Sequence, residues 1–343
     1  MELKASVEKK TFFFKRPSGT SRGILTEKYA WFITVWDINR PTVKGVGECS
    51  IIEGLSPDFT TENEYNSKIL EVVKNINHFS KRIDQLVDFP SIYFGLEMAL
   101  LDLINGGKRI FFDTPFTQGE ANIPINGLVW MGELSFMQSQ IQQKIKEGFD
   151  CIKIKIGALH FEKEFNLIQS IRKDYPAEKL SIRVDANGAF NTKEALKKLH
   201  ELSLLGIHSI EQPIAVNQWK EMYELCQNTP IPIALDEELI GHNTIESKEK
   251  LLVKIQPQYI ILKPSLIGGF KGTTEWIKLA DDLEVPWWIT SALESNIGLD
   301  AIAQFTSTYN NSLHQGLGTG ALYTNNFPSP LFIENGFIGR RKT

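Results

Sequence analysis

The sequence predicts a (β/α)8 barrel, a modified TIM barrel, behind an N-terminal α+β capping domain. The first observation is the length, since 343 residues suit a barrel of roughly 250 residues with an accessory domain. The second is a regular alternation of short apolar runs and helical segments from about residue 121 onward. An open, doubly wound sheet is the alternative fold. It lacks support, because no GxGxxG turn follows the first run.

The predicted barrel strands are eight short runs bounded by helical segments. They are Ile123–Leu128, Cys151–Gly157, Leu180–Ala186, Ser209–Pro213, Ile231–Asp236, Tyr259–Lys263, Pro286–Ser291 and His314–Gly318. The predicted helices between them are Phe136–Glu147, Phe161–Lys173, Asn191–Leu205, Gln218–Gln227, Asn243–Lys254, Phe270–Leu283 and Asn296–Thr306. The active site of such a barrel lies at the carboxyl ends of its strands.

Residues 1–113 are predicted to form the capping domain, because strand-like segments come first and helical segments follow. The expected strands are Leu3–Phe14, Tyr29–Asn39 and Val43–Cys49, and the expected helices are Glu62–Asn77 and Phe89–Asn105. Residues 16–23 are rich in Gly, Ser and Pro, which predicts a mobile loop between the first two strands. Residues 114–320 are then the catalytic barrel.

The composition disfavours several classes of protein. A net charge of −4 offers no basic surface to nucleic acid. Three scattered cysteines without CxxC spacing argue against disulfides and thiolate zinc sites, and they fit a reducing cytoplasm. Neither a signal-peptide run at the start nor a stretch of 18 apolar residues occurs. We therefore expect a cytoplasmic protein without a membrane segment. The oligomeric state stays open.

The run CIKIKIG, Cys151–Gly157, carries two lysines on one face. Side chains alternate along a strand, so Lys153 and Lys155 leave the sheet together, opposite three isoleucines. Taken alone, the run equally fits an edge strand that lysines protect against aggregation. The later runs favour a functional site, because four of them also carry a charged side chain at or near their carboxyl end: Asp185, Glu211, Asp236 and Lys263.

The three acids are spaced by one strand–helix unit each, so they converge from adjacent strands. One acid after a strand is ordinarily a helix cap, but three in succession with lysines on the flanking strands are poorly explained in that way. Oxygen ligands without nearby His or Cys predict a site for Mg²⁺, for which Mn²⁺ can substitute. A dication on a substrate carboxylate acidifies the adjacent carbon. Lys155 is the expected base, because Lys153 and the dication disfavour its charged form, and Lys263 faces it across the site.

These residues together resemble the enolase superfamily, in which a lysine base works beside Mg²⁺. The lysine pair of CIKIKIG, the three acids and the stretch KPSLIGG around Lys263 are similar to its muconate lactonising enzyme subgroup. The resemblance covers essentially the whole chain. It implies a small-molecule carboxylate substrate and a C-terminal segment, 321–343, that returns to the cap. It also implies catalytic roles for Lys155 and Lys263 and metal ligation by Asp185, Glu211 and Asp236.

Within the subgroup, the chain most resembles dehydratases that eliminate water from a succinyl-bearing cyclohexadiene carboxylate in menaquinone biosynthesis. The stretches that carry this are GECSIIEGLS (47–56), VDANGAF (184–190), SALESNIGL (291–299) and GLGTGALYTNNFPSPL (316–331). Residues 318–320 are Gly-Thr-Gly, where dipeptide epimerases usually carry Asp-x-Asp for a substrate ammonium group. The resemblance implies a syn elimination in which Lys155 moves the proton and Lys263 lies over the flat intermediate.

Other residues carry weaker expectations. Lys153, Asn187 and Ser291 are expected to bind substrate, although turn geometry explains Asn187 and strand-end capping explains Ser291 equally well. Arg22 lies in the predicted loop, where a solvated arginine is the simpler interpretation than one that closes over the substrate. Two other functions stay open. An N-acylamino-acid racemase or dipeptide epimerase uses the same two lysines, and a non-catalytic metal-binding protein is disfavoured because both lysines and all three acids are present.

Overall fold

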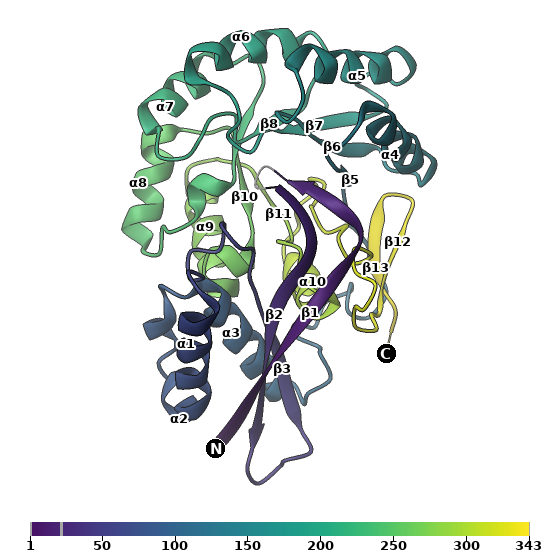
Figure 1. Ribbon diagram of the computed structural model, residues 1–343. Coiled ribbons are helices and arrows are strands. Elements are labelled where there is room, and N and C mark those ends of the chain that lie inside the picture. The colour runs from purple at the N-terminus through teal and green to yellow at the C-terminus, as the bar shows by residue number, and fades with distance from the viewer. Residues whose placement is uncertain (1, 21–22, 343) are drawn as a thin grey trace.

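The computed structural model describes residues 2–20 and 23–342, and its centre is a curled parallel sheet. Seven strands follow one another around this sheet in the order β11-β10-β9-β8-β7-β6-β5 (Figure 1). The strands are β5 (Gly127–Val129), β6 (Cys151–Lys155), β7 (Ser181–Asp185), β8 (Ser209–Glu211), β9 (Ile233–Leu235), β10 (Tyr259–Leu262) and β11 (Trp287–Ile289). The predicted barrel fold is confirmed.

The eighth run closes the sheet through single bridges. Gln315 pairs with Ile125, and Gly316 pairs with Thr290, both in parallel. The backbone N–H groups of Asn126 and Ser291 donate to the carbonyl oxygens of Gln315 and Gly316, at 3.0 and 3.1 Å. The expected full strand at His314–Gly318 was therefore wrong in extent, although the segment lies where the barrel needs its eighth member.

The first run is also shorter than expected, because it is divided between two sheets. Ile123–Pro124 forms β4, which pairs antiparallel with a C-terminal strand, and only Gly127–Val129 joins the barrel.

Seven helices follow the barrel strands and form an arc around them (Figure 1). They are α4 (Leu134–Lys146), α5 (Phe161–Asp174), α6 (Thr192–Ser203), α7 (Trp219–Asn228), α8 (Ile245–Ile255), α9 (Gly269–Asp282) and α10 (Asn296–Thr306).

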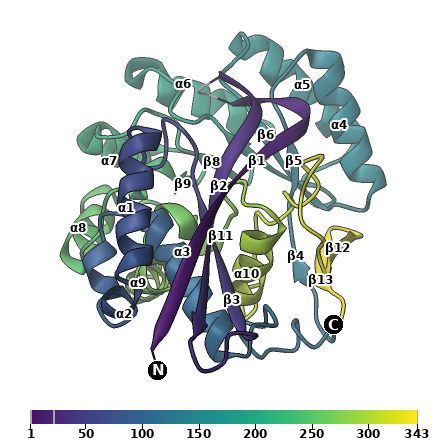
Figure 2. The same cartoon turned by 60° about the horizontal axis from the view of Figure 1, so that its bottom comes forward.

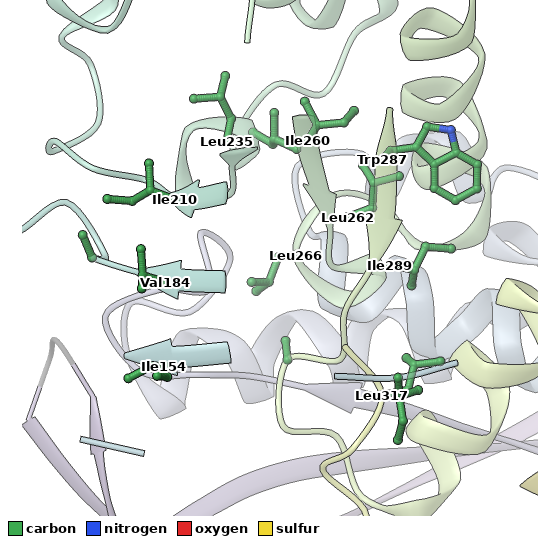
Figure 3. Packing of buried hydrophobic residues seen from close by; sticks show 14 of the residues in the cluster. Ile154, Val184, Ile210, Leu235, Ile260, Leu262, Leu266, Trp287, Ile289 and Leu317 are labelled. Carbon is green, nitrogen blue, oxygen red and sulfur yellow. The ribbon is translucent and has the colours of Figure 1, made fainter. Parts of the chain in front are cut away.

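The side chains of the barrel strands divide into two sets. Outward-facing residues such as Ile154, Val184 and Ile210 pack beneath the helices in the main core (Figure 3). A smaller buried cluster inside the barrel consists of Ala234, Ile261 and Trp288. The alternation that predicted two faces for the second run thus holds around the barrel. Trp287 and Trp288 of β11 are both buried.

The capping domain consists of a three-stranded antiparallel sheet packed on helices. Its elements are β1 (Leu3–Thr20), β2 (Gly23–Asp37), β3 (Lys44–Ser50), α1 (Glu62–Lys74), α2 (Ile76–Phe79) and α3 (Pro90–Ile104). The helix expected at Glu62–Asn77 is interrupted at Asn75. The long β1–β2 hairpin extends from the cap helices to the barrel (Figures 1 and 2).

The loop expected at residues 16–23 is largely strand. The ladder resumes after an irregularity that follows Phe13, and it pairs residues 18–20 with residues 23–25. A hairpin partner supplies backbone hydrogen bonds, which here prevail over the local preference of Gly, Ser and Pro for turns. Arg22 lies outside the described residues.

The C-terminal segment touches both parts of the molecule. Its first part lies along β1, where the N–H of Lys15 donates to Leu322 and the N–H of Thr324 donates to Phe13. Its last part forms the hairpin β12 (Leu331–Glu334) and β13 (Phe337–Arg340), which pairs with β4. The boundaries at residues 113 and 320 stay predictions. Within residues 2–20 and 23–342, no helix combines the length and apolar character needed to cross a membrane.

Candidate active site

The predicted polar residues meet at the carboxyl ends of five neighbouring strands. Lys155, Asp185 and Glu211 end β6, β7 and β8, and they stand side by side in the strand register. Asp236 and Lys263 come directly after β9 and β10. Because β6 and β10 are four strands apart in an eight-membered ring, Lys155 and Lys263 enter the barrel mouth from opposite walls.

Two lysines bridge the carboxylates at the bottom of the site. The Lys153 ammonium group lies 3.0 Å from Asp185 Oδ2 and also contacts Glu211. Lys263 Nζ contacts Asp236 and lies 3.9 Å from Glu211 Oε1. Opposite charges thus alternate around the mouth, so each buried charge has a partner.

Lys155 is held by two side chains from the next strand and its turn. Its Nζ donates to Asp185 Oδ2 at 3.1 Å and to Asn187 Oδ1 at 2.8 Å. Asn187 has a left-handed φ of 44°, and its Nδ2 donates to Glu237 Oε1 at 2.8 Å. A carboxylate only accepts hydrogen bonds, so Glu237 fixes which end of the amide faces Lys155.

The pKa values follow from burial and from these charges. Burial and the neighbouring Asp185 raise the pKa of Glu211 to about 8, and burial likewise raises the pKa of Asp236. Burial opposes ionisation of Asp185 as well, but the ammonium groups of Lys153 and Lys155 outweigh it and lower the pKa of that carboxyl. For Lys153 and Lys263, burial is outweighed by the surrounding carboxylates, which raise the pKa of both.

The donor chemistry of the three acids fits a hard dication. Asp185, Glu211 and Asp236 are all buried, and the buried Glu211 Oε1 lacks a hydrogen-bond partner among the described residues. In the described part of the chain, no three His, Cys, Asp or Glu side chains already form a metal-binding group. Their contacts explain this, because Glu211 and Asp236 are turned to Lys153 and Lys263. The acids are the residues that would hold Mg²⁺.

A pocket of about 650 Å³ opens above these residues, between barrel and cap. Lys153, Lys155, Asn187 and Lys263 line its polar side. Its apolar lining comes from both domains and consists of Leu25, Ile52, Leu55, Leu128, Trp130, Ala292 and Leu293. Such a pocket suits a small ligand with anionic groups at one end and an apolar body.

Ser291, the third predicted substrate-binding residue, also lines this pocket. Its Oγ lies 2.5 Å from Thr319 Oγ1, and the two form a hydroxyl pair after β11 and the eighth run. Both side chains are buried. The structure thus brings together all eight residues that the sequence assigned to the site.

The apolar lining of the pocket was not predicted from the sequence. Leu25 and Leu55 belong to the cap, so no strand-end rule of the barrel identifies them. Trp130 had a usable signal, because it follows the first barrel strand directly. Gln140 of α4 fixes its backbone by accepting from the Trp130 N–H and donating to its carbonyl oxygen, each at 3.0 Å.

Comparisons with known proteins identify relatives of this chain. The family described as Enolase C-terminal domain-like matches residues 137–342. The chain is 46% identical to an o-succinylbenzoate synthase of Desulfotalea psychrophila, over 99% of each protein. It also superposes on a crystal structure of MenC from the same organism with a TM-score of 0.87 and 42% identity, which covers 98% of this chain and 99% of that one.

A more distant structure has the same fold. The dipeptide epimerase of Cytophaga hutchinsonii, complexed with Mg and the dipeptide D-Ala-L-Val, superposes with a TM-score of 0.83 at 22% identity, over 98% of this chain and 93% of that one. The chain therefore belongs to the enolase superfamily, in the branch of the muconate lactonising enzymes.

Proposed function

We propose that this chain is an o-succinylbenzoate synthase. It would eliminate water from 2-succinyl-6-hydroxy-2,4-cyclohexadiene-1-carboxylate, abbreviated SHCHC, to give 2-succinylbenzoate. The observation that carries the proposal is the pair Lys155 and Lys263, which enter one pocket from opposite walls above three buried carboxylates. The 46% identity to the Desulfotalea enzyme over nearly the whole chain supports this substrate.

The charges of the site fit a dianionic substrate that arrives with a dication. Lys153, Lys155, Lys263 and Arg183 place cationic side chains inside the barrel, among the carboxyl groups of Asp185, Glu211, Asp236 and Glu237. Mg²⁺ held by Asp185, Glu211 and Asp236 would supply Lewis-acid stabilisation of charge on the substrate carboxylate. Its positive charge would also favour the binding of a substrate with two carboxylates. The Mg complex of the Cytophaga epimerase supports this choice of metal.

Lys155 would move the proton in both halves of the elimination. Its neutral amine takes the proton from the carbon next to the ring carboxylate, and the electron pair of that C–H bond expels the hydroxyl group from the ring. The ammonium group returns the proton to the departing oxygen, so that water leaves and the ring becomes aromatic. Asp185 and Asn187 hold Nζ at the pocket wall, while Lys263 places a positive charge over the opposite face.

The test is the loss of diene absorbance when SHCHC and Mg²⁺ are added. Lys155→Ala should lose about 10²–10⁴-fold in rate, and Lys155→Arg should also fail because a guanidinium does not deprotonate near neutral pH. Lys263 acts through charge, so Lys263→Arg should retain more activity than Lys263→Ala. Lys155→Ala that dehydrates SHCHC at the parental rate would refute the assignment.

The racemase hypothesis is tested with the same variants. A racemase moves protons on both faces of its substrate, so both lysines are needed for solvent deuterium to enter an N-succinyl amino acid. If exchange is rapid in the parent protein while SHCHC is untouched, the chain is a racemase and the dehydratase proposal fails.

A further inference from the structure

One wall of the pocket has a strained backbone. Leu293, which follows β11 and lines the pocket, has a φ of 61°. Left-handed backbone is unfavourable for a residue with a branched side chain, and it persists only where the surroundings enforce it. The pocket residues between β11 and Leu293, which are Thr290, Ser291 and Ala292, do not have a positive φ.

Side chains fix the peptide groups on both sides of Leu293. The Tyr323 hydroxyl donates to the Leu293 carbonyl oxygen at 2.6 Å. Glu294 accepts from the Ala292 N–H at 2.6 Å and from the Ser265 hydroxyl at 2.6 Å. Because Ser265 comes two residues after Lys263, Glu294 also joins this wall to the segment that carries the second lysine.

The cap supplies the remaining restraint through Glu48. This carboxylate of β3 accepts from the N–H of Ser295 at 2.8 Å, from the Ser295 hydroxyl at 2.5 Å and from the N–H of Gly298 at 2.9 Å. It therefore acts as an N-terminal cap for α10, although it comes from another domain. Glu48 is completely buried, so water cannot replace these bonds.

Lys28 of β2 compensates the charge of this junction. It is buried and it donates to Ser50. Burial lowers the pKa of its ammonium group, and the carboxylates of Glu48 and Glu294 partly offset this effect. Lys28 stands three residues after Leu25, whose side chain closes the pocket from the hairpin. The same junction thus fixes pocket residues of both domains.

We propose that Glu48, supported by Lys28, is a positioning residue for substrate binding, which docks the cap on the loop after β11 and holds Leu293 in its strained conformation. The proposal rests on the proposed dehydratase function for its kinetic test. Neither Glu48 nor Lys28 lines the pocket. Their effect on the substrate is therefore indirect and should fall on KM more than on kcat, because a looser wall weakens the binding of substrate and transition state alike.

The first test compares Glu48→Gln with Glu8→Gln, an exposed acid of β1. Glutamine directs an N–H₂ group at backbone donors that need an acceptor, so at least one charge-assisted bond is lost. KM for SHCHC should rise about 10-fold in Glu48→Gln, with kcat within about threefold of the parent, while Glu8→Gln keeps both constants. A parental KM, or an equal loss confined to kcat, would overturn the proposal.

The second test asks whether Glu48 acts through Leu293. Glycine accepts a left-handed φ without strain, so Leu293→Gly should keep or raise Tm while it raises KM about 10-fold through loss of the wall. The control Glu284→Gly relieves a similar φ of 55° at an exposed position, and it should keep the parental KM. If Leu293→Gly itself has a parental KM, the wall does not set substrate binding and the proposal fails.

The double variant Glu48→Gln/Leu293→Gly gives the decisive result. If both substitutions act on one wall, KM stays near that of Leu293→Gly alone, whereas independent effects multiply to about 100-fold. The parent, the two single variants and the double variant are also compared by thermal unfolding. Glu48→Gln should lower Tm less in the Leu293→Gly background than in the parent protein. The two proposals fail on different results. A parent protein without SHCHC turnover refutes the dehydratase function, whereas additive Tm shifts refute the positioning role of Glu48.

Discussion

Glu211→Gln should stabilise the metal-free protein while it weakens the binding of Mg²⁺. Burial and the charge of Asp185 raise the pKa of Glu211 from 4.5 to about 8. Between these two pH values the folded protein keeps a proton that the unfolded chain releases. The stability of the metal-free protein therefore falls as the pH rises through this window. Glutamine resembles the protonated acid in shape and carries no such penalty.

The shift in the pKa of Glu211 sets the order of magnitude of the effect. At pH 7, keeping Glu211 protonated against an ordinary pKa of 4.5 costs the folded parent protein about 3 kcal/mol of stability. Glutamine avoids this loss. An entropy of unfolding of about 2.1 cal/mol/K per residue, applied to 343 residues, converts this to an increase in Tm of about 4–5 °C. The increase should be smaller at pH 5 and larger at pH 8.

The assay is thermal unfolding at pH 5 to 8, in EDTA and in excess Mg²⁺. Glu178→Gln, at an exposed position, is the control and should match the parent. In EDTA, Glu211→Gln should melt above the parent by a margin that grows with pH. In Mg²⁺ at about 100 times its Kd the parent gains about 2.7 kcal/mol, and the variant gains less because it lacks one ligand charge. A variant that melts below the parent in EDTA at pH 8 refutes the pKa argument. An equal gain from Mg²⁺ removes Glu211 from the ligands.

Three further outcomes are expected. Exhaustive chelation with EDTA should abolish SHCHC turnover, and Mg²⁺ should restore it; full activity after chelation would exclude the metal. Arg340→Met should lower the free energy of unfolding, measured with denaturant, by about 3–5 kcal/mol, because it leaves the buried Asp300 carboxylate without the ion pair at 3.1 Å. As the control, Arg341→Met at an exposed position should change this free energy by less than about 0.5 kcal/mol. Gly47→Ala should destabilise the cap by about 1–3 kcal/mol or more in the same assay, since a Cβ there would overlap the carbonyl oxygen of Gly95 on α3.

Strand-end residues were the predictable part of the site. Asp185 and Glu211 each close an apolar run, and a parallel sheet aligns the ends of adjacent strands, so sequence spacing was enough to bring them together. The pairing of Lys153 with both acids could not be predicted, because it depends on side-chain rotamers inside the barrel. The apolar wall from Leu25 and Leu55 was missed because it depends on how the cap docks on the barrel.

The fold departs from the prediction where a partner strand decides the outcome. Residues 18–20 looked like a loop, yet they are strand because residues 23–25 lie beside them. Ile123–Pro124 looked like barrel, yet it pairs with β13, more than 200 residues away. The division into eight runs held because each helix forces the chain back to the same edge of the sheet. Which residues within a run actually pair is decided by neighbours that the local sequence does not specify.

Two motifs that supported the family resemblance turn out to be the two sides of one junction. GECS contributes Glu48, and SALESNIG contributes Ser295 and Gly298, whose backbone and hydroxyl donors bind that carboxylate. Each stretch had been valued as a family signature without a physical role. Their contact gives both stretches a physical role, because replacing either side alone would leave buried polar groups of the other without hydrogen-bond partners.

The residues after the eighth run decide between the two kinds of substrate that the subgroup handles. A free ammonium group bound in this pocket would need an anionic partner, which Gly318-Thr319-Gly320 does not supply. Thr319 and Ser291 instead offer a buried pair of hydroxyl groups. Hydroxyls can donate to a carboxylate, but they cannot neutralise a cation removed from water. We therefore expect a chain that ends in a carboxylate, such as a succinyl group, to bind beside them, where the free amino terminus of a dipeptide would lack an anionic partner.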